Sequence, residues 1–173
     1  MIYVCVGTYP MQFNRLLSMV DQLIAESVIT DDVYAQTGAS DYDPIYYPHI
    51  AYLEKSAFDQ MLAKSDLVVC HAGMGIINNA LEMGKTVIAV PRRKKHKEHV
   101  NDHQLSSARA FSERGHIILA ENQEELVQGI KTASTFQPEI RSNDAEGISL
   151  CIAQKLSDLD RVLNDSSLVD NSK

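Results

Sequence analysis

The feature of this chain that most constrains its fold is a short apolar run that ends in a glycine-rich turn and is followed by a helical pattern. Residues 67–70 are apolar and have the length of a buried parallel strand, and residues 71–75 contain two glycines. Residues 87–90 repeat this order, with Pro91 and a polar segment after them. Because strands that alternate with helices form a parallel sheet covered on both faces, the sequence predicts an α/β fold with a Rossmann-like, doubly wound parallel sheet.

The same alternation extends along most of the chain. Further strands are predicted at residues 2–6, 33–36, 50–52 and 117–119, and further helices at residues 13–24, 58–62 and 124–131. In such a sheet the carboxyl ends of the strands share one edge, and ligands bind there. We call this edge the rim, and the turns expected along it are residues 7–8, 36–38, 71–75 and 91–99.

The composition restricts the class of protein. With 173 residues, of which 45% are hydrophobic, the chain is long enough for one compact domain. Its net charge of -7 argues against a general nucleic-acid binder, which needs a broad cationic surface. Cys5, Cys70 and Cys151 are too widely spaced to suggest a disulfide framework or a paired-thiol metal site. Because we find neither a basic leader nor a run of about 20 apolar residues, we expect a cytoplasmic protein.

The sequence predicts four consecutive parts. These are a domain at residues 1–133, a linker at 134–143, an amphipathic helix at 144–164 and a disordered tail at 165–173. The helix is predicted because apolar residues recur at spacings of three and four between positions 148 and 163. Its apolar stripe could pack on the sheet of its own domain or against another protein.

The turn at residues 71–75 is the strongest candidate for a ligand site. Gly73 and Gly75 allow the backbone to approach a bound group closely. The helix that begins near Met74 points unpaired amides and the positive end of its dipole toward the turn. Such a helix start binds anions, and a phosphate group fits it best. The alternative is a tight connection without a ligand, in which His71 would only cap local backbone.

A basic run at residues 92–97 stands out in this acidic chain. Arg92 and Arg93 are nearest to the end of the predicted strand, so we expect them to contact phosphate. Residues 94–97 could face lipid headgroups or a partner, or they could form a solvated loop.

A polar segment with two histidines follows the basic run, and we predict that it lies on a new helix. The pair His99 and His103 could suggest a metal site, but their spacing fixes no third ligand. Contact with a sugar and hydrogen bonding on the helix surface both fit the segment better. We therefore expect no bound metal.

Several motifs occur in one order along the chain. They are Gly7-Thr8, Gln36-x-Gly38, His71-Ala72-Gly73-x-Gly75, Gly84-Lys85, Pro91-Arg92-Arg93 and Glu98-His99-x-x-Asp102-His103-Gln104. Through these motifs, residues 1–131 resemble the nucleotide-binding half of a split GT-B glycosyltransferase, the glycosyltransferase family 28 C-terminal domain. The likeness is to the small bacterial subunits of exopolysaccharide and capsule assembly, and to the eukaryotic catalytic subunit that extends dolichol pyrophosphate with N-acetylglucosamine.

This resemblance implies a fold equivalent to the C-terminal half of a GT-B glycosyltransferase and the activity of a hexosyltransferase. It implies a UDP-sugar donor, no cofactor, and activity only with a membrane-anchored partner subunit. That partner would carry the acceptor-binding half and the lipid-linked saccharide acceptor. The reaction would belong to polysaccharide biosynthesis, and the chain would be recruited to the inner face of the membrane through the partner.

The resemblance also implies roles for individual residues. His71 and His99 are the candidates for proton handling in catalysis. The residues implied in substrate binding are Gly7, Thr8, Gln36, Gly38, Ala72, Gly73, Met74, Gly75, Asn78, Asn79, Arg92, Arg93, Glu98, Asp102, His103 and Gln104. Members of the family usually have Thr or Ser at the position of Ile76 and a ribose-binding Glu at that of Asn79, and this chain differs at both. These differences leave two alternatives open: a non-catalytic subunit that stabilises a partner transferase, and a free-standing nucleotide-binding protein.

Overall fold

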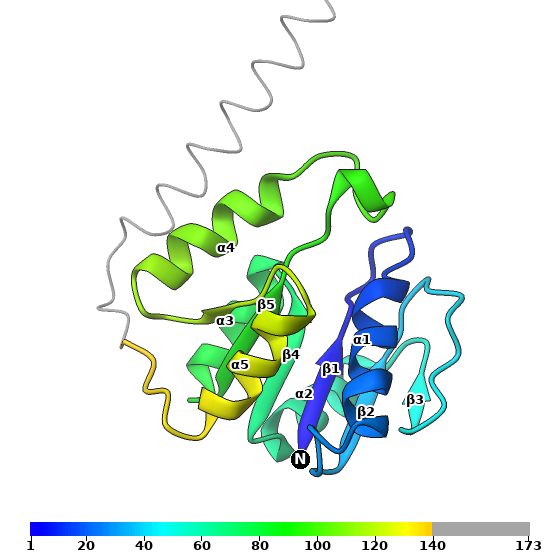
Figure 1. Cartoon of the computed structure of the whole chain (residues 1–173), viewed down its shortest axis with the longest axis horizontal. Coiled ribbons are helices and arrows are strands. Elements are labelled where there is room, and N and C mark those ends of the chain that lie inside the picture. The colour runs from blue at the N-terminus through cyan, green and yellow to red at the C-terminus, as the bar shows by residue number, and fades with distance from the viewer. Residues whose placement is uncertain (140–173) are drawn as a thin grey trace, which may run out of the picture. The chain divides into compact units, whose positions relative to one another are not determined.

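Six parallel strands form one central sheet (Figure 1). The computed structural model describes residues 1–139, so the predicted helix at 144–164 and the predicted tail at 165–173 lie outside the described residues. The strands follow the order β3-β2-β1-β4-β5-β6 across the sheet. Their bounds are β1 (Ile2–Cys5), β2 (Val33–Gln36), β3 (His49–Ile50), β4 (Leu67–His71), β5 (Thr86–Val90) and β6 (Ile118–Leu119).

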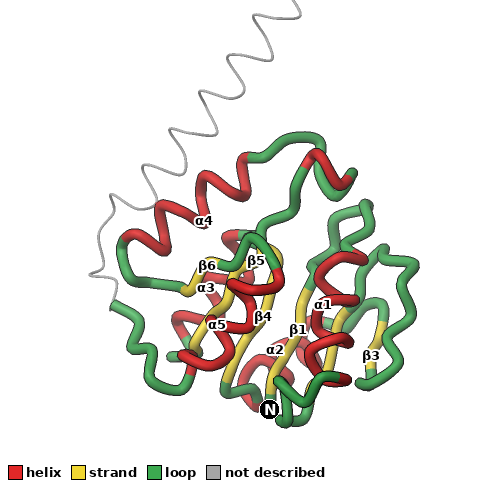
Figure 2. The backbone as a smooth tube through the Cα atoms, viewed as in Figure 1, coloured by secondary structure: helices red, strands yellow, loops and turns green. Residues whose placement is uncertain are grey.

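Helices cover both faces of the sheet, as the tube in Figure 2 shows. The helices are α1 (Asn14–Ala25), α2 (Lys55–Lys64), α3 (Met74–Glu82), α4 (His103–Glu113) and α5 (Gln123–Ala133), with a 3-10 helix η1 (Lys94–His96) before α4. On one face, strand residues such as Val4 and Val69 pack with residues of α1 and α5. On the other, Tyr3 and Val68 pack with residues of α2, α3 and α4. Since every strand also alternates its side chains between the two faces, this arrangement confirms the predicted doubly wound fold.

The strand register brings the polar turns to one edge. Cys5 at the end of β1 pairs with Cys70 in β4 and with Gln36 in β2, and His71 at the end of β4 pairs with Val90 at the end of β5. The carboxyl ends of these four parallel strands are therefore level, and the expected rim is confirmed. Because β4 lies between β1 and β5, the turn at 71–75 lies between the loops that follow those two strands.

The helix predicted to hold Glu98 and His99 begins later than expected. It starts at His103, with Asp102 at the capping position, so Glu98 and His99 lie in a loop. The physical reason is the backbone of Lys97, which has a φ of 57° in the left-handed region and ends η1. A helix cannot continue through a residue in that conformation, so the segment after η1 must turn before α4 begins.

Candidate functional site

The start of α3 leaves its first amides available for a ligand. Gly73 occupies the capping position with an extended backbone, no side chain of the described residues caps the helix, and its first turn contains no acidic residue. The amides of the first turn have no acceptor within the helix, by the geometry of any α-helix. A Cβ added at Gly75 would meet no atom of residues 1–139 within 4 Å, so within this part of the chain the space beside Gly75 is open. The turn therefore offers amides, a dipole end and room to an anion.

The imidazole ring of His71 packs between Gly7 and Gly73. A Cβ at Gly7 or at Gly73 would overlap the imidazole ring of His71. Gly7 also has a φ of +78°, which disfavours any other residue there. Gly38 has a φ of +57°, and a Cβ there would overlap the carbonyl of Gly7. Gly7 and Gly38 thus shape the turns at the ends of β1 and β2.

The imidazole of His71 is held in its neutral form. Its Nδ1 lies 3.3 Å from the carbonyl oxygen of Cys5, which assigns the proton to Nδ1 and leaves Nε2 as an acceptor. Burial lowers the pKa of His71 to about 4, against the opposing effect of the Cys5 carbonyl, and the charge of Arg92 adds to the decrease. At neutral pH this side chain can accept a proton or a hydrogen bond but carries no charge for binding phosphate.

Arg92 does not reach the surface, which corrects the expectation that it contacts phosphate directly. Its side chain is 0% exposed. Its guanidinium donates hydrogen bonds to four main-chain carbonyls, those of Val6, Met11, Gln12 and Glu98, at 2.8 to 3.1 Å. It also stacks over the ring of Phe13 at 4.7 Å. A cation enclosed in this way is fixed to the protein and cannot touch a ligand at the rim.

Glu98 is likewise buried, and the expectation that it contacts sugar hydroxyls is not met by this structure. Its two carboxylate oxygens accept hydrogen bonds from Nε and Nη2 of Arg15 at 2.8 and 2.9 Å. The amide of Arg93 donates to the same carboxylate at 2.9 Å. The Glu98 side chain is only 1% exposed. Because α1 supplies the arginine, this ion pair ties α1 to the loop after β5.

Arg93 is the half-buried member of the arginine pair and is already surrounded by acidic groups. Its Nη1 donates to Glu121 at 3.0 Å, and its Nε lies 3.4 Å from Asp102. Asp102 in turn accepts a hydrogen bond from the amide of Lys94, which is the largest cause of its lowered pKa. These two carboxylates offset the charge of Arg93, so its guanidinium attracts a phosphate less strongly than an unpaired arginine would.

An aromatic cluster lies where the loops after β1 and β5 meet. Tyr9 stacks on His99 with ring centres 4.5 Å apart, and His103 meets the His99 ring edge-on at 4.7 Å. Burial lowers the pKa of His99, and the neighbouring His103 and Arg92 lower it further. Two of the predicted residues, His99 and His103, are therefore brought together through a ring contact.

The remaining predicted residues divide into packed and accessible ones. Gln36 is buried and accepts a hydrogen bond from the amide of Leu53, and Gln104 is buried and accepts one from the amide of Arg92. The residues that keep an accessible surface at or beside the turn are Thr8, Gly73, Met74, Gly75, Asn78 and Asn79, whereas Ala72 is buried. The part of the predicted site that a ligand could contact is thus concentrated at the start of α3.

Three residues near the rim were missed in the sequence: Tyr9, Arg15 and Glu121. Tyr9 follows Gly7-Thr8 directly, so its place at the rim could have been predicted from the turn itself. Arg15 and Glu121 have no such signal, because they meet their partners across 83 and 28 residues of chain. Only the tertiary fold brings these charges together.

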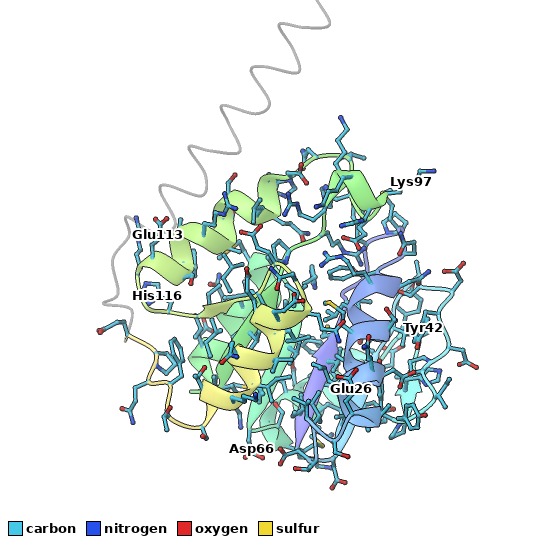
Figure 3. All side chains as sticks on the ribbon, viewed as in Figure 1. Glu26, Tyr42, Asp66, Lys97, Glu113 and His116 are labelled. Carbon is cyan, nitrogen blue, oxygen red and sulfur yellow. The ribbon has the colours of Figure 1, made fainter. Side chains whose placement is uncertain are left out.

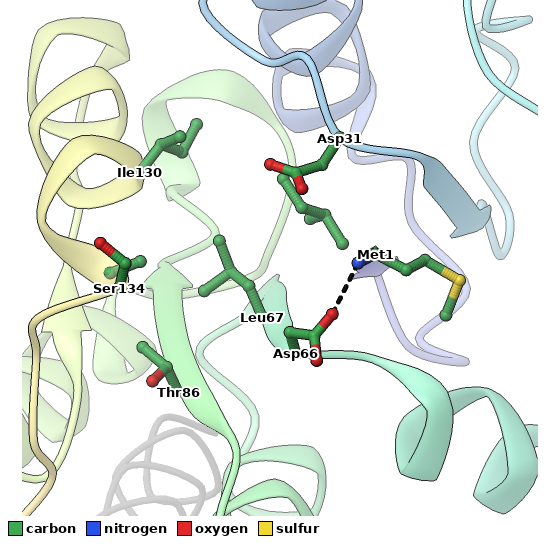
Figure 4. A pocket seen from close by; sticks show the side chains of 9 residues that line it. Met1, Asp31, Asp66, Leu67, Thr86, Ile130 and Ser134 are labelled. Carbon is green, nitrogen blue, oxygen red and sulfur yellow. Dashed lines mark hydrogen bonds and ion pairs between the residues drawn. The ribbon is translucent and has the colours of Figure 1, made fainter.

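A shallow pocket of about 200 Å³ lies at the opposite edge of the sheet, among the amino ends of β1, β4 and β5 (Figure 4). It is lined by residues that include Ile2, Leu67 and Ile130, and the terminal ammonium of Met1 donates to Asp66 beside them at 2.7 Å. Figure 3 shows Asp66 and the rim residue Lys97 at opposite ends of the domain. No residue of the predicted site lines this pocket, so we do not place the function there.

Within residues 1–139, no three His, Cys, Asp or Glu side chains are placed to hold a metal ion. None of the helices in this part of the chain is both long and apolar enough to cross a membrane.

Comparison with known proteins places this geometry in a family. A segment of the chain is 35% identical over 66 residues to human UDP-N-acetylglucosamine transferase subunit ALG13, covering 38% of this chain and 6% of that protein. Two solved structures share the fold. The glycotransferase of kitacinnamycin matches with a TM-score of 0.57 and 16% identity, over 78% of this chain and 34% of its own. MurG of Acinetobacter baumannii matches with a TM-score of 0.50 and 15% identity, over 80% and 46%.

The chain therefore spans less than half the length of each of these relatives, and the two structural likenesses concern the fold alone. The family itself is shown by a match over nearly the whole sequence. Residues 1–158 match the model of the glycosyltransferase family 28 C-terminal domain. The chain belongs to this family of glycosyltransferases.

Proposed function

We propose that the chain is the donor-binding, catalytic subunit of a two-chain glycosyltransferase. It would transfer a sugar from a UDP-sugar to a lipid pyrophosphate-linked saccharide in polysaccharide biosynthesis. The acceptor-binding half would come from a membrane-anchored partner, which would recruit the chain to the inner face of the membrane. Membership of family 28 and the human relative, whose name describes a transferase subunit, support this proposal.

The observation that carries the proposal is the uncapped start of α3 at the rim. The amides of the first turn have no acceptor within the helix, the space beside Gly75 is open among the described residues, and the first turn contains no acidic residue. This is the arrangement that a donor diphosphate requires, because its negative charge increases as the bond to the sugar breaks. The diphosphate leaves with the electron pair of the sugar–oxygen bond while the acceptor oxygen forms the new bond.

The residues of this chain would stabilise the leaving group rather than activate the acceptor. The start of α3 would bind the diphosphate, and Asn79 and Asn78 would lie near the ribose. Nε2 of the neutral His71 would accept a hydrogen bond or a proton at the turn, as its proton on Nδ1 allows. His99 is a second candidate for proton handling. The base that activates the acceptor would be supplied largely by the partner.

A substitution at Gly75 tests the donor site with little risk to the fold. Gly75→Ala adds a methyl group into open space, and alanine favours a helix over glycine, so we expect equal or higher stability, by up to about 1 kcal/mol. If the diphosphate packs against this residue, the same variant should bind UDP at least about tenfold more weakly, which corresponds to roughly 1.4 kcal/mol.

Calorimetry with UDP on the full chain, copurified with its membrane-anchored partner, measures this effect. Uridine is the control ligand. It lacks the phosphates, so Gly75→Ala should bind it nearly as tightly as the wild type does. Unchanged UDP binding by Gly75→Ala would move the diphosphate away from α3. A wild-type complex that binds no nucleotide sugar and transfers no sugar would refute the proposed enzyme.

A non-catalytic subunit that stabilises a competent partner is the second candidate. It is favoured by Ile76, which is only 7% exposed and packs in the core instead of offering the hydroxyl usual at that position, and by Asn79. Asn79→Glu separates the two functions. A gain in UDP affinity with transfer retained would indicate a degraded donor site, whereas loss of transfer would show that Asn79 is adapted to its own substrate.

A further inference from the structure

Arg92 carries a buried positive charge that no carboxylate within residues 1–139 contacts directly. The acceptors of its guanidinium are main-chain carbonyls, and its Nε has no hydrogen-bond partner among residues 1–139. The nearby carboxylate of Glu98 is engaged by Arg15 and by the amide of Arg93. Burial lowers the pKa of Arg92 to about 10, so the group remains charged at neutral pH. The interior of the rim therefore keeps an excess positive charge.

The sheet topology places this charge behind the turn at 71–75. Arg92 follows β5, and its acceptor Val6 follows β1, while β4 lies between those two strands. The side chain must therefore span the carboxyl end of β4, where the turn begins. Its charge contributes to the low pKa of His71, as expected for a neighbour of that ring.

The four carbonyls held by Arg92 come from both loops that flank the turn. Val6, Met11 and Gln12 belong to the end of β1 and the loop after it, and Glu98 belongs to the loop after β5. The loop after β1 lies beside η1 (Figure 1). The two loops also meet directly, since Nε2 of Gln12 donates to the carbonyl of His96 at 3.1 Å. Carbonyl oxygens that were not drawn inward would present negative dipole ends beside the turn and would repel a bound anion.

We propose that Arg92 is a positioning residue for diphosphate recognition, which it serves without touching the donor. It turns four carbonyls away from the rim and leaves a positive charge behind the start of α3. This inference rests on the proposed function and adds a determinant of its preference for a charged ligand. If Arg92 were purely structural, replacing it would weaken the binding of all ligands equally. In the role proposed here, replacing it weakens the binding of the diphosphate selectively.

The experiment compares UDP with uridine on the full chain, copurified with its partner, by calorimetry. Arg92→Met removes the charge and the donors, and we expect the preference for UDP over uridine to fall at least about tenfold while uridine binding changes little. Arg92→Lys restores the charge and should keep the preference within roughly threefold of the wild type. Lys95→Met removes an exposed charge from the same segment and is the matched control, expected to behave as the wild type.

Two results would overturn the inference alone. One is a folded Arg92→Met variant with the wild-type preference for UDP, and the other is an equal loss of UDP and uridine binding in that variant. Absence of UDP binding by the wild type would instead overturn the proposed function and the inference with it.

A second variant keeps the inference testable if Arg92→Met fails to fold. Replacing Lys94, Lys95 and Lys97 together with Met removes only exposed charges. If the buried charge dominates, this triple variant keeps the preference for UDP over uridine. In the wild type, 0.5 M salt should change that preference less than about threefold, because salt screens exposed charges most. Loss of the preference in the triple variant would assign diphosphate recognition to the surface lysines and overturn the inference.

Discussion

His71 links the chemistry of the turn to the pH dependence of the fold. Its pKa in the folded chain is about 4, below the value near 6.5 of an unfolded histidine. Between these values the unfolded chain binds a proton that the folded chain does not, so stability falls as the pH decreases from about 6.5 to 4. Above pH 6.5 both states are neutral, and the contribution of the ring is fully present.

We therefore predict that His71→Gln flattens the pH dependence of stability. Relative to the wild type, the variant should lose less stability on going from pH 7 to pH 4.5, by on the order of 2 kcal/mol. Urea unfolding at the two pH values measures this difference. His99 contributes in the same direction, because its pKa is also lowered, and so some slope should remain in the variant. Identical slopes in both proteins would show that His71 titrates normally.

Some features of single residues in the site can be predicted from the sequence, and others cannot. The turn at 71–75 was predictable because Gly73 and Gly75 follow an apolar run, and both signals are local. The burial of Arg92 and Glu98 was not predictable, because their hydrogen-bond partners are distant in sequence: Val6 lies 86 residues from Arg92, and Arg15 lies 83 residues from Glu98. Charged residues are mostly exposed, so composition alone indicates a surface position for both.

The ion pair of Arg15 and Glu98 connects two elements, α1 and the loop after β5, and gives a prediction about their attachment. Glu98→Gln leaves the half-buried guanidinium of Arg15 without its carboxylate, which we expect to cost about 3 kcal/mol, the lower end of the range for a buried pair. The melting temperature should decrease by roughly 10 °C. Glu113→Gln changes an exposed glutamate and is the control, with an expected effect within about 0.5 kcal/mol.

Thermal unfolding followed by circular dichroism checks this prediction. The double variant Arg15→Met with Glu98→Gln should be more stable than Glu98→Gln alone, because it removes the unpaired charge as well. If both glutamate variants melt at the same temperature, the Arg15–Glu98 pair does not hold α1 to the loop.

The carboxylate of Asp21 is one of the groups of α1 that fix the loop between β2 and β3 to this helix. Asp21 is 3% exposed and accepts hydrogen bonds from the hydroxyl of Tyr42 and from the amides of Ile45 and Tyr46, at 2.8 to 2.9 Å. Figure 3 shows Tyr42 beside the ribbon of α1. The loop has almost no regular structure, and hydrogen bonds from two of its amides to the side chain of Asp21 help to order it.

We predict that Asp21→Asn loosens this loop selectively. An amide side chain has only one acceptor oxygen, so at least one of the three donors loses its partner, at a cost of about 1 to 3 kcal/mol. Hydrogen exchange at Ile45 and Tyr46 should become faster, while exchange in β1 and β4 should change only with global stability. Unaltered protection of both loop amides would contradict the role of Asp21.

At the scale of the whole molecule, the boundary of the domain can be tested by shortening the chain. The sequence predicted an end at residue 133, but the amide of Glu139 donates to the carbonyl of Gly115 at 3.0 Å, and Nδ1 of His116 lies 3.0 Å from the carbonyl of Glu139. These contacts fix Glu139 to the turn that follows α4. A chain of residues 1–139 should thus be more stable than one of residues 1–133 by about 1 kcal/mol, measured by urea unfolding.

The chain of residues 1–139 also tests which part of the protein binds the partner subunit. If the predicted helix at 144–164 binds the partner subunit, residues 1–139 should keep UDP affinity within about twofold but fail to copurify with the partner. Copurification of the shortened chain with its partner would place the interface on the domain itself. The experiment therefore separates donor binding from assembly.

The order of strands and helices, the doubly wound fold and the position of the turn at 71–75 follow from the sequence alone. Apolar periodicity and glycine turns are local signals, because each is contained within one short segment of the chain. The tertiary structure decided which charged residues of the rim remain accessible. Arg92 and Glu98 are enclosed by carbonyls and an arginine from the far end of the chain, whereas the start of α3 stays open. Burial depends on what the fold brings next to a residue, and no local pattern in the sequence encodes that neighbour.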